Sequence, residues 1–354
     1  MHKSPIFTIF KGVATFALLL LLAAPALASA HDPVLDRDMG QSRQTVRDIE
    51  RKTAGTASHT VLNAILARHA SLYGFSGGGA AAPAGATGAS GGNSGVGFGV
   101  WASGGWQHVN NSSSQWSRGG LTNVTGGFDV QFGDAVFGVA VGGEWMRLDT
   151  NNSGRYHSDG FSLTPNFSYA ILPTLVVDAA VGAAWQNNYR KTGYISTAAG
   201  IPLPGEMDAN FSSWRLFTAA GLTKFWTFDN WVLSARLGGM YQHQETSSYT
   251  MRGLGGVPPF SMDFANVDKY RSDLFQLSLN GRLGYQIGNF TPFVSATYLQ
   301  DVAKSGRQND FVGANFEAGF NYRIGPVSLG LTALYGVRYQ YQNVGGMANF
   351  RWDF

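Results

Sequence analysis

The feature that most constrains this chain is an alternation of apolar and polar residues that runs from Val96 to Phe354. Its clearest example is the closing run Ala348-Asn-Phe350-Arg-Trp352-Asp-Phe354, in which a polar residue separates each apolar residue from the next. A period of two gives a β-strand one apolar face and one polar face. A soluble protein rarely ends on such an aromatic strand. In an outer-membrane β-barrel the last strand closes the sheet and leaves no edge in the lipid. The pattern therefore predicts a transmembrane barrel.

The composition agrees with a protein whose outer surface faces lipid. Charged residues make up 13% of the chain and aromatic residues another 13%, with 47 glycines among 354 residues, whereas a globular domain has about 25% charged residues. A low-complexity secreted protein is the alternative. The formal charge of +3 includes Lys3 and Lys11, so the charge balance does not indicate a nucleic-acid partner. The absence of cysteine excludes disulfide bonds and thiolate metal sites.

Residues 1–30 are predicted to be a secretory signal peptide. Two lysines supply its positive charge, an apolar core ends before Pro25, and Ala28-Ser29-Ala30 forms a cleavage site. The apolar run is shorter than the roughly 20 residues that a membrane-spanning helix needs. The mature chain is therefore expected to be exported, and to be either soluble or a barrel.

Three regions of different composition follow. Residues 31–76 are predicted to be a helical segment, in which an apolar stripe occupies Val61–Leu72 at helical spacing and Ser58 is a candidate N-cap. Residues 77–95 are mostly small or polar and are predicted to be a flexible linker. Residues 96–354 carry the period-two pattern of the barrel.

The alternating region divides into twelve predicted strands, at 96–109, 120–132, 135–148, 156–171, 174–190, 209–226, 231–246, 269–287, 290–301, 310–324, 327–341 and 345–354. Tight turns and longer polar connections alternate strictly between them. The tight turns are Gly133-Asp134, Leu172-Pro173, Thr227 to Asn230, Gly288-Asn289 and Gly325-Pro326. The other connections include 110–119, 149–155, 191–208, 247–268 and 302–309. Alternate connections of an antiparallel barrel lie on opposite rims, so we expect a short-turn rim, which also holds both ends of the barrel, and a long-loop rim.

The two faces of the predicted strands differ in chemistry. On the strand 135–148, Phe137 and Trp145 share the apolar face and lie about 20 Å apart along the barrel axis, close to the apolar band of about 25 Å in outer-membrane barrels. Aromatic girdles are expected at the long-loop rim, from Trp185, Tyr241 and Tyr298, and at the short-turn rim, from Trp231 and Phe132. The opposite face carries charges of both signs, which predicts a polar lumen lined by Asp129, Glu144, Asp178, Arg236, Arg282, Glu317, Arg338 and Arg351.

Taken together, these features resemble the C-terminal translocator β-domain of autotransporters, the type V secretion proteins of Gram-negative bacteria. The resemblance covers about 96–354, and its motifs include the opening strand Gly99-Val100-Trp101-Ala102-Ser103-Gly104-Gly105 and the closing aromatic residues Phe350, Trp352 and Phe354. It implies a monomeric, twelve-stranded antiparallel barrel in outer-membrane lipid that translocates or anchors its own N-terminal segment. It also implies that the closing aromatic residues are an assembly signal, read by periplasmic chaperones and the barrel-assembly machinery.

Two features depart from the pattern of that family. Only residues 31–95 are expected to precede the barrel after cleavage, so a passenger is nearly absent, and the linker 77–95 separates the helical segment from the first strand. A flexible stretch of this length reaches about 24 Å. Either the helical segment or the linker could therefore occupy the pore, and the sequence leaves both open. Some family members cleave themselves at an Asn-Asn pair, but Asn63 stands alone in the helical segment and no cleavage is expected.

Catalytic residues, cofactors and metal ligands are not expected. His157 and Ser158 are hydrolase residue types near the long-loop rim, but adjacent residues on a strand point to opposite faces. His243 and Glu245 share a face near that rim, as in an omptin-like protease, although such barrels have a different number of strands. The histidines at positions 59 and 69 lack the spacing of a metal-binding pair.

The sequence therefore predicts an autotransporter-type barrel of the outer membrane whose N-terminal segment lies in the pore, in the periplasm or at the cell surface. One alternative is a porin-like channel for small solutes with an incidental N-terminal extension. Another is an outer-membrane barrel enzyme. The lumen charges could select solutes or only balance one another.

Overall fold

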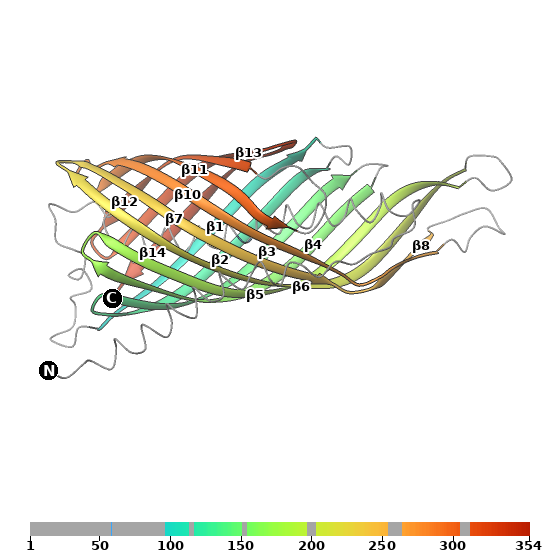
Figure 1. Ribbon diagram of the computed structural model, residues 1–354, viewed down its shortest axis with the longest axis horizontal. Coiled ribbons are helices and arrows are strands. Elements are labelled where there is room, and N and C mark those ends of the chain that lie inside the picture. The colour runs from blue at the N-terminus through green and yellow to red at the C-terminus, as the bar shows by residue number, and fades with distance from the viewer. Residues whose placement is uncertain are drawn as a thin grey trace.

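The computed structural model describes residue 58 and residues 96–112, 117–150, 154–196, 203–253, 264–304 and 312–354. One sheet of fourteen strands lies within these ranges. Twelve of the strands close into an antiparallel barrel, because β1 pairs with β14 and β5 pairs with β6 as well as with β4 (Figure 1). The predicted twelve-stranded transmembrane barrel fold is confirmed.

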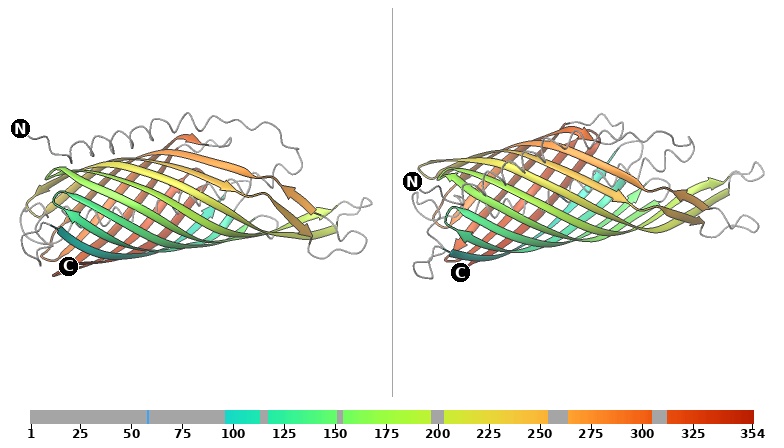
Figure 2. Two further views of the ribbon diagram at one scale, coloured as in Figure 1. Left: turned by 90° about the horizontal axis from the view of Figure 1, so that it is seen from below. Right: turned by 60° about the horizontal axis from the view of Figure 1, so that its bottom comes forward.

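The barrel strands are β1 (Val96–Asn111), β2 (Ser117–Phe132), β3 (Ala135–Thr150), β4 (Gly154–Leu172), β5 (Leu175–Ser196), β6 (Leu203–Phe228), β7 (Trp231–Thr246), β10 (Tyr270–Tyr285), β11 (Phe290–Lys304), β12 (Val312–Ile324), β13 (Val327–Arg338) and β14 (Tyr341–Asp353). Two further strands, β8 (Tyr249–Gly253) and β9 (Phe264–Val267), form a hairpin that pairs with β6. With β5 and β6, this hairpin extends one side of the barrel beyond the other strands (Figure 2).

The short-turn rim lies at one end of the molecule, on the left in Figure 1. Its turns fall between the predicted strands, and Gly133, Gly288 and Gly325 adopt φ values of 57°, 57° and 56° there. Glycine accepts this left-handed backbone at no steric cost, which is why these positions end one strand and start the next. Val96 and Asp353 also lie at this rim, since β1 begins and β14 ends there.

The long-loop rim differs from the prediction in several places. The predicted loop 247–268 contains the β8–β9 hairpin, and the predicted loop 191–208 is shortened because β5 runs to Ser196 and β6 starts at Leu203. The last connection at this rim is a tight turn at Tyr339 and Gln340, so the strict alternation of tight and long connections was wrong there. Gln340 takes a φ of 56° without being glycine, and the sequence offered no signal for it.

The outer surface of the barrel is apolar. Large exposed hydrophobic residues alternate with buried ones on nearly every strand, as in β3, where Phe137, Val139, Val141 and Trp145 are exposed. The predicted girdle residues Trp185, Tyr298, Trp231 and Phe132 are all exposed, whereas Tyr241 is partly buried because it donates to Asp273 at 2.8 Å. No helix among the described residues is long and apolar enough to cross a membrane.

Side chains fill part of the lumen. Phe217 is fully buried on the inner face of β6, and its ring lies over Gly182 of β5, where an added Cβ would come within 2.1 Å. Trp101 lies in the same way over Gly127. These two glycines make room for aromatic rings that cover the wall from inside.

Candidate functional site

The lumen is the candidate functional site, because it brings together the charged residues that the sequence placed on one face. The charges form ion pairs: Asp129–Arg351 at 2.8 Å, Glu144–Arg215 at 2.7 Å, Asp178–Arg236 at 2.6 Å and Asp301–Arg338 at 3.1 Å. Each pair joins strands that are not neighbours in the sheet, namely β2 with β14, β3 with β6, β5 with β7 and β11 with β13. The pairs therefore span one or two intervening strands along the inner wall.

Glu144 is the centre of the most extended network. Arg215 is fully buried and donates from Nη2 to one carboxylate oxygen of Glu144, while Gln186 donates to the other. Ser213 donates to Gln186 at 2.9 Å, and Asn188 donates to Ser213 at the same distance. Every link runs between side chains of different strands, so the network holds β3, β5 and β6 together from inside.

The other predicted lumen charges have partners of different kinds. The guanidinium of Arg282 lies 3.5 Å from the centre of the Phe293 ring, which is a cation–π contact. Glu317 accepts a hydrogen bond from Ser295 at 3.0 Å. At the short-turn rim, Arg351 forms a second ion pair with Asp353. All eight predicted charges lie on the inner face of the barrel.

Three partners in these pairs, Arg215, Asp301 and Asp353, were not among the predicted lumen charges, and the first two are the more informative. Arg215 lies between the outward-facing Trp214 and Leu216, so the same alternation would have placed it in the lumen. Asp301 was assigned to the end of a predicted strand, beside a predicted loop, but β11 continues to Lys304. The signal was present in the period of two for both residues.

One described residue of the N-terminal segment, Ser58, lies inside the lumen. Its backbone is helical and its side chain is fully buried. Its hydroxyl donates to Oε1 of Gln242 at 2.9 Å, and Gln242 is on the inner face of β7 with 1% of its surface exposed. Because Ser58 is itself helical, it is not the residue that precedes a helix, as the predicted N-cap would be. The predicted signal peptide, the predicted linker and all other residues of the predicted helical segment lie outside the described residues.

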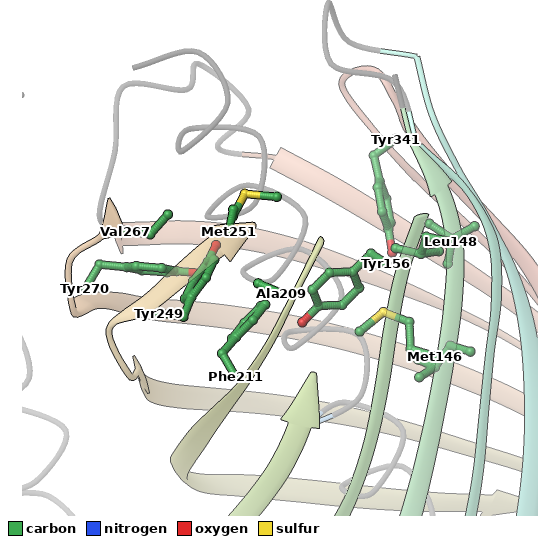
Figure 3. Packing of buried hydrophobic residues seen from close by; sticks show 12 residues of the cluster. Met146, Leu148, Tyr156, Ala209, Phe211, Tyr249, Met251, Val267, Tyr270 and Tyr341 are labelled. Atoms are coloured by element: carbon green, nitrogen blue, oxygen red, sulfur yellow. The ribbon is translucent and has the colours of Figure 1, made fainter. Parts of the chain in front are cut away.

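A cluster of apolar residues, which we call the mouth cluster, lies at the long-loop end of the lumen (Figure 3). Its core is the stacked pair Phe211 and Tyr249, whose ring centres are 4.1 Å apart with 10° between the planes. Tyr156 extends the cluster and donates to Asn188 at 2.9 Å, which links it to the network around Glu144. The remaining members are Val109, Leu121, Met146, Leu148, Ala209, Met251, Val267, Tyr270 and Tyr341. The lumen therefore carries polar networks and smaller apolar clusters around Phe217 and Phe225 along its length, and a larger apolar cluster at this mouth.

The closing aromatic residues point outward at the short-turn rim. Phe350, Trp352 and Phe354 are 41%, 48% and 48% exposed. The backbone of Phe354 exchanges two hydrogen bonds with Phe98 at 3.0 and 3.2 Å, and the two rings are stacked 6.4 Å apart. Phe354 therefore extends the seam between β14 and β1.

The residues considered for catalysis do not converge on a shared site. His157 faces outward beside Tyr189, with 5.9 Å between the ring centres, whereas Ser158 is buried on the opposite face. His243 contacts Asp273 through Nδ1 at 2.8 Å, and its neighbour Glu245 is paired instead with Lys269 and Arg271. Among the described residues, no group of histidine and acidic side chains is placed to hold a metal ion.

The closed antiparallel sheet, apolar outside and charged within, defines a β-barrel of the outer-membrane class. The family model of the autotransporter beta-domain matches residues 97–349. The chain therefore belongs to the autotransporter beta-domain family, whose barrels sit in the outer membrane and which is not a class of enzymes.

Solved structures agree on the fold. The translocator domain of the autotransporter NalP from Neisseria meningitidis is similar with a TM-score of 0.63 and 12% sequence identity, over 88% of this chain and 99% of that one. The beta domain of the Bordetella autotransporter BrkA is similar with a TM-score of 0.54 and 16% sequence identity, over 73% of this chain and 100% of that one. No curated protein matches the sequence.

Proposed function

We propose that the barrel forms a pore through the outer membrane that holds its own N-terminal segment, residues 31–95, and anchors it there. The observation that carries the proposal is the hydrogen bond from Ser58 to Gln242 inside the lumen. A helical residue at this position takes up part of the bore that a solute would use. The NalP domain is described as a translocator, and the proposal extends that role to this chain.

The proposal includes an orientation and a division of the chain. Outer-membrane barrels have short turns on the periplasmic side and longer loops outside, so the short-turn rim would face the periplasm. Residues 1–30 would be removed as a signal peptide, residues 31–76 would be the helical segment within the pore, and residues 77–95 would connect it to β1. The barrel would be monomeric in outer-membrane lipid, without a nucleic-acid partner.

The proposal also gives a role to Phe350, Trp352 and Phe354. We propose that they are the signal by which periplasmic chaperones and the barrel-assembly machinery recognise the chain. Their outward exposure and the pairing of Phe354 with Phe98 support it, because the last strand to pair closes the barrel. We further propose that the chain has no catalytic function and uses no cofactor.

A cysteine cross-link tests the position of the N-terminal segment, and the chain has no cysteine of its own to interfere. Ser58→Cys combined with Gln242→Cys should be joined by a short bifunctional thiol-reactive cross-linker in outer-membrane preparations, visible as a shift on a denaturing gel. The matched control is Ser58→Cys with Tyr241→Cys, because Tyr241 is the next residue but faces outward. Equal cross-linking of both pairs, or of neither, contradicts the proposal.

Conductance separates the pore that holds a segment from the porin-like alternative. The intact protein in a planar bilayer should conduct weakly or flicker, and deletion of residues 32–95 should raise the single-channel conductance. A high and stable conductance of the intact protein, unchanged by the deletion, would support a solute channel.

A further inference from the structure

A shallow apolar groove crosses the lipid-facing surface of five neighbouring strands, from β12 through β13, β14 and β1 to β2. It has a volume of about 750 Å³, within the range of small-molecule sites. Most barrel strands carry bulky outward residues, but here Gly104, Gly346, Ala333 and Ala318 face outward. The groove is a hollow in the lipid-facing surface.

The groove has the length of an acyl chain. Four strand spacings of about 4.8 Å give it a length of roughly 19 Å, and one leaflet of a hydrocarbon core of about 30 Å is roughly 15 Å thick. The exposed side chains of Val124 and Leu331 are part of its lining. Its lining is almost wholly apolar, so an acyl chain would fill it without leaving a polar atom unpaired.

Polar and basic side chains lie directly above one end of the groove. Trp106 forms part of the groove, and its ring centre is 6.3 Å from that of His108, two residues nearer the long-loop rim. Arg118 of β2 donates from Nε to Nε2 of His108 at 3.1 Å, and both side chains are on the outer face. Toward the long-loop rim, the surface changes from the apolar groove to a tryptophan and then to an arginine. A lipid changes in the same direction, from its apolar acyl chain to its charged headgroup.

The charges around Arg118 favour an anion. Asp149 of β3 is opposite Arg118 in the strand register, and Arg155 of β4 is opposite Asp149. Arg147, two residues along β3, also faces outward, and Asp159 is the second carboxylate on this part of the surface. Three arginines thus face two aspartates here. No ion pair involving Arg118 occurs among the described residues, so its guanidinium can bind a phosphate in a charge-assisted hydrogen bond.

We propose that this groove is a specific binding site for one lipid with an anionic phosphate headgroup, whose acyl chain lies across the seam between β1 and β14. The lipid would cover the joint at which the barrel closes. The site lies outside the lumen, so it stands whether or not the lumen holds the N-terminal segment.

Native mass spectrometry of the purified full chain tests the site, with phosphatidylglycerol and phosphatidylcholine of identical acyl chains as probes. The protein should retain one phosphatidylglycerol about fivefold more tightly than phosphatidylcholine, since one arginine near a headgroup has an effect of that size. Arg118→Gln should remove this preference while phosphatidylcholine binding stays. Arg271→Gln, at an outward arginine that pairs with Glu245, is the matched control and should keep the preference.

Filling the groove tests the acyl chain. Gly346→Leu should weaken the binding of both lipids, and a side chain fits there because an added Cβ meets no atom closer than 3.4 Å. Gly104→Leu is the second variant, with 4.0 Å to the nearest atom. Ala183→Leu, on the outward face of β5, is the control and should bind lipid as the unchanged protein does.

Three results would overturn the proposal. The first is loss of binding in Ala183→Leu as well, which indicates nonspecific lipid around the barrel. The second is full binding in both Gly346→Leu and Gly104→Leu. The third is a mass of two chains that either groove variant reduces to one chain, which assigns the groove to a second copy of the protein.

Discussion

Arg215 shows how strongly single side chains in the lumen depend on their partners. Its side chain is fully buried and forms an ion pair with Glu144, which is itself 7% exposed. Bringing a guanidinium out of water costs more than an average hydrogen bond returns, so the charge is stable only with its carboxylate in place. The pair is therefore a structural contact of the wall.

Replacing one member of this pair should destabilise the barrel more than replacing both. Arg215→Met leaves Glu144 buried without its counter-charge and should lower the free energy of unfolding by about 3 kcal/mol. Arg215→Met with Glu144→Met removes both charges and should recover most of the loss. Urea unfolding in lipid vesicles measures the difference. If the double variant is as unstable as the single one, the pair is not the source of the stability.

Phe354 gives a second prediction at the scale of one residue. Phe354→Ser should lower the amount of folded, heat-modifiable barrel in the outer membrane, because the variant loses the stacked contact with Phe98 and the proposed assembly signal. Phe228→Ser is the control, since Phe228 is equally outward at the short-turn rim and 59% exposed, but belongs to an internal strand. Equal losses in the two variants would remove any special role of Phe354.

At the scale of the strands, the ring of Phe217 in β6 can pack directly against the inner wall because the residue beneath it in β5, Gly182, has no side chain. An added Cβ at Gly182 would come within 2.1 Å of the ring, so the phenylalanine would have to leave its place. Gly182→Val should destabilise the barrel by about 1–3 kcal/mol, measured as a lower temperature of the heat-induced gel shift. Gly281→Val in β10 is the control, because an added Cβ there meets no atom within 4 Å. A similar shift in both variants would mean that strand propensity, and not packing, is responsible.

Sequence alternation predicted the barrel strands well where lipid lies on one side and the lumen on the other. It failed at the long-loop rim. β5 runs to Ser196 and β6 starts at Leu203, but residues 191–208 do not keep the alternation in the sequence and were predicted as a loop. The hairpin of β8 and β9 was missed although Tyr249, Met251 and Val267 are buried, because strands of five and four residues are too short to show the alternation clearly. The turn at Gln340 contains no glycine that would mark it in the sequence. The nearby glycines Gly345 and Gly346 do not form a turn, because they lie within β14.

The candidate site could be predicted only in part. Alternation fixes which face a residue takes, and all eight predicted lumen charges are on the inner face. It does not fix the partner, because partners such as Asp129 and Arg351 lie on strands separated by another strand and far apart in the sequence. Which of them meet depends on the curvature and stagger of the closed sheet. The contact of Ser58 with Gln242 depends on the chain entering the lumen, which no local pattern encodes.

At the scale of the whole molecule, the lumen wall is close to electroneutral. In the described part of the chain, seven arginines and six carboxylates face inward: Arg190, Arg215, Arg236, Arg282, Arg323, Arg338 and Arg351, with Asp129, Glu144, Asp178, Asp301, Glu317 and Asp353. A pore with this wall should discriminate weakly between small cations and anions.

The reversal potential of the protein without residues 32–95 tests this balance. Under a tenfold gradient of potassium chloride it should be far below the roughly 59 mV of an ideally selective pore. Arg338→Gln removes the partner of Asp301 and should shift the potential toward cation selectivity. A strongly selective pore before that substitution would show that the paired charges still act on ions.

The ion pairs between non-neighbouring strands also have a mechanical consequence. Backbone hydrogen bonds keep adjacent strands in register, but they allow a sheet to bend about the strand direction. An ion pair that crosses one or two intervening strands, such as the pair of Glu144 with Arg215, limits this bending and fixes the local curvature of the wall. Such ties on both sides of the barrel resist its flattening into an ellipse under the lateral pressure of the bilayer. The ion pairs therefore help the wall to keep its curvature around the segment of chain that the lumen is proposed to hold.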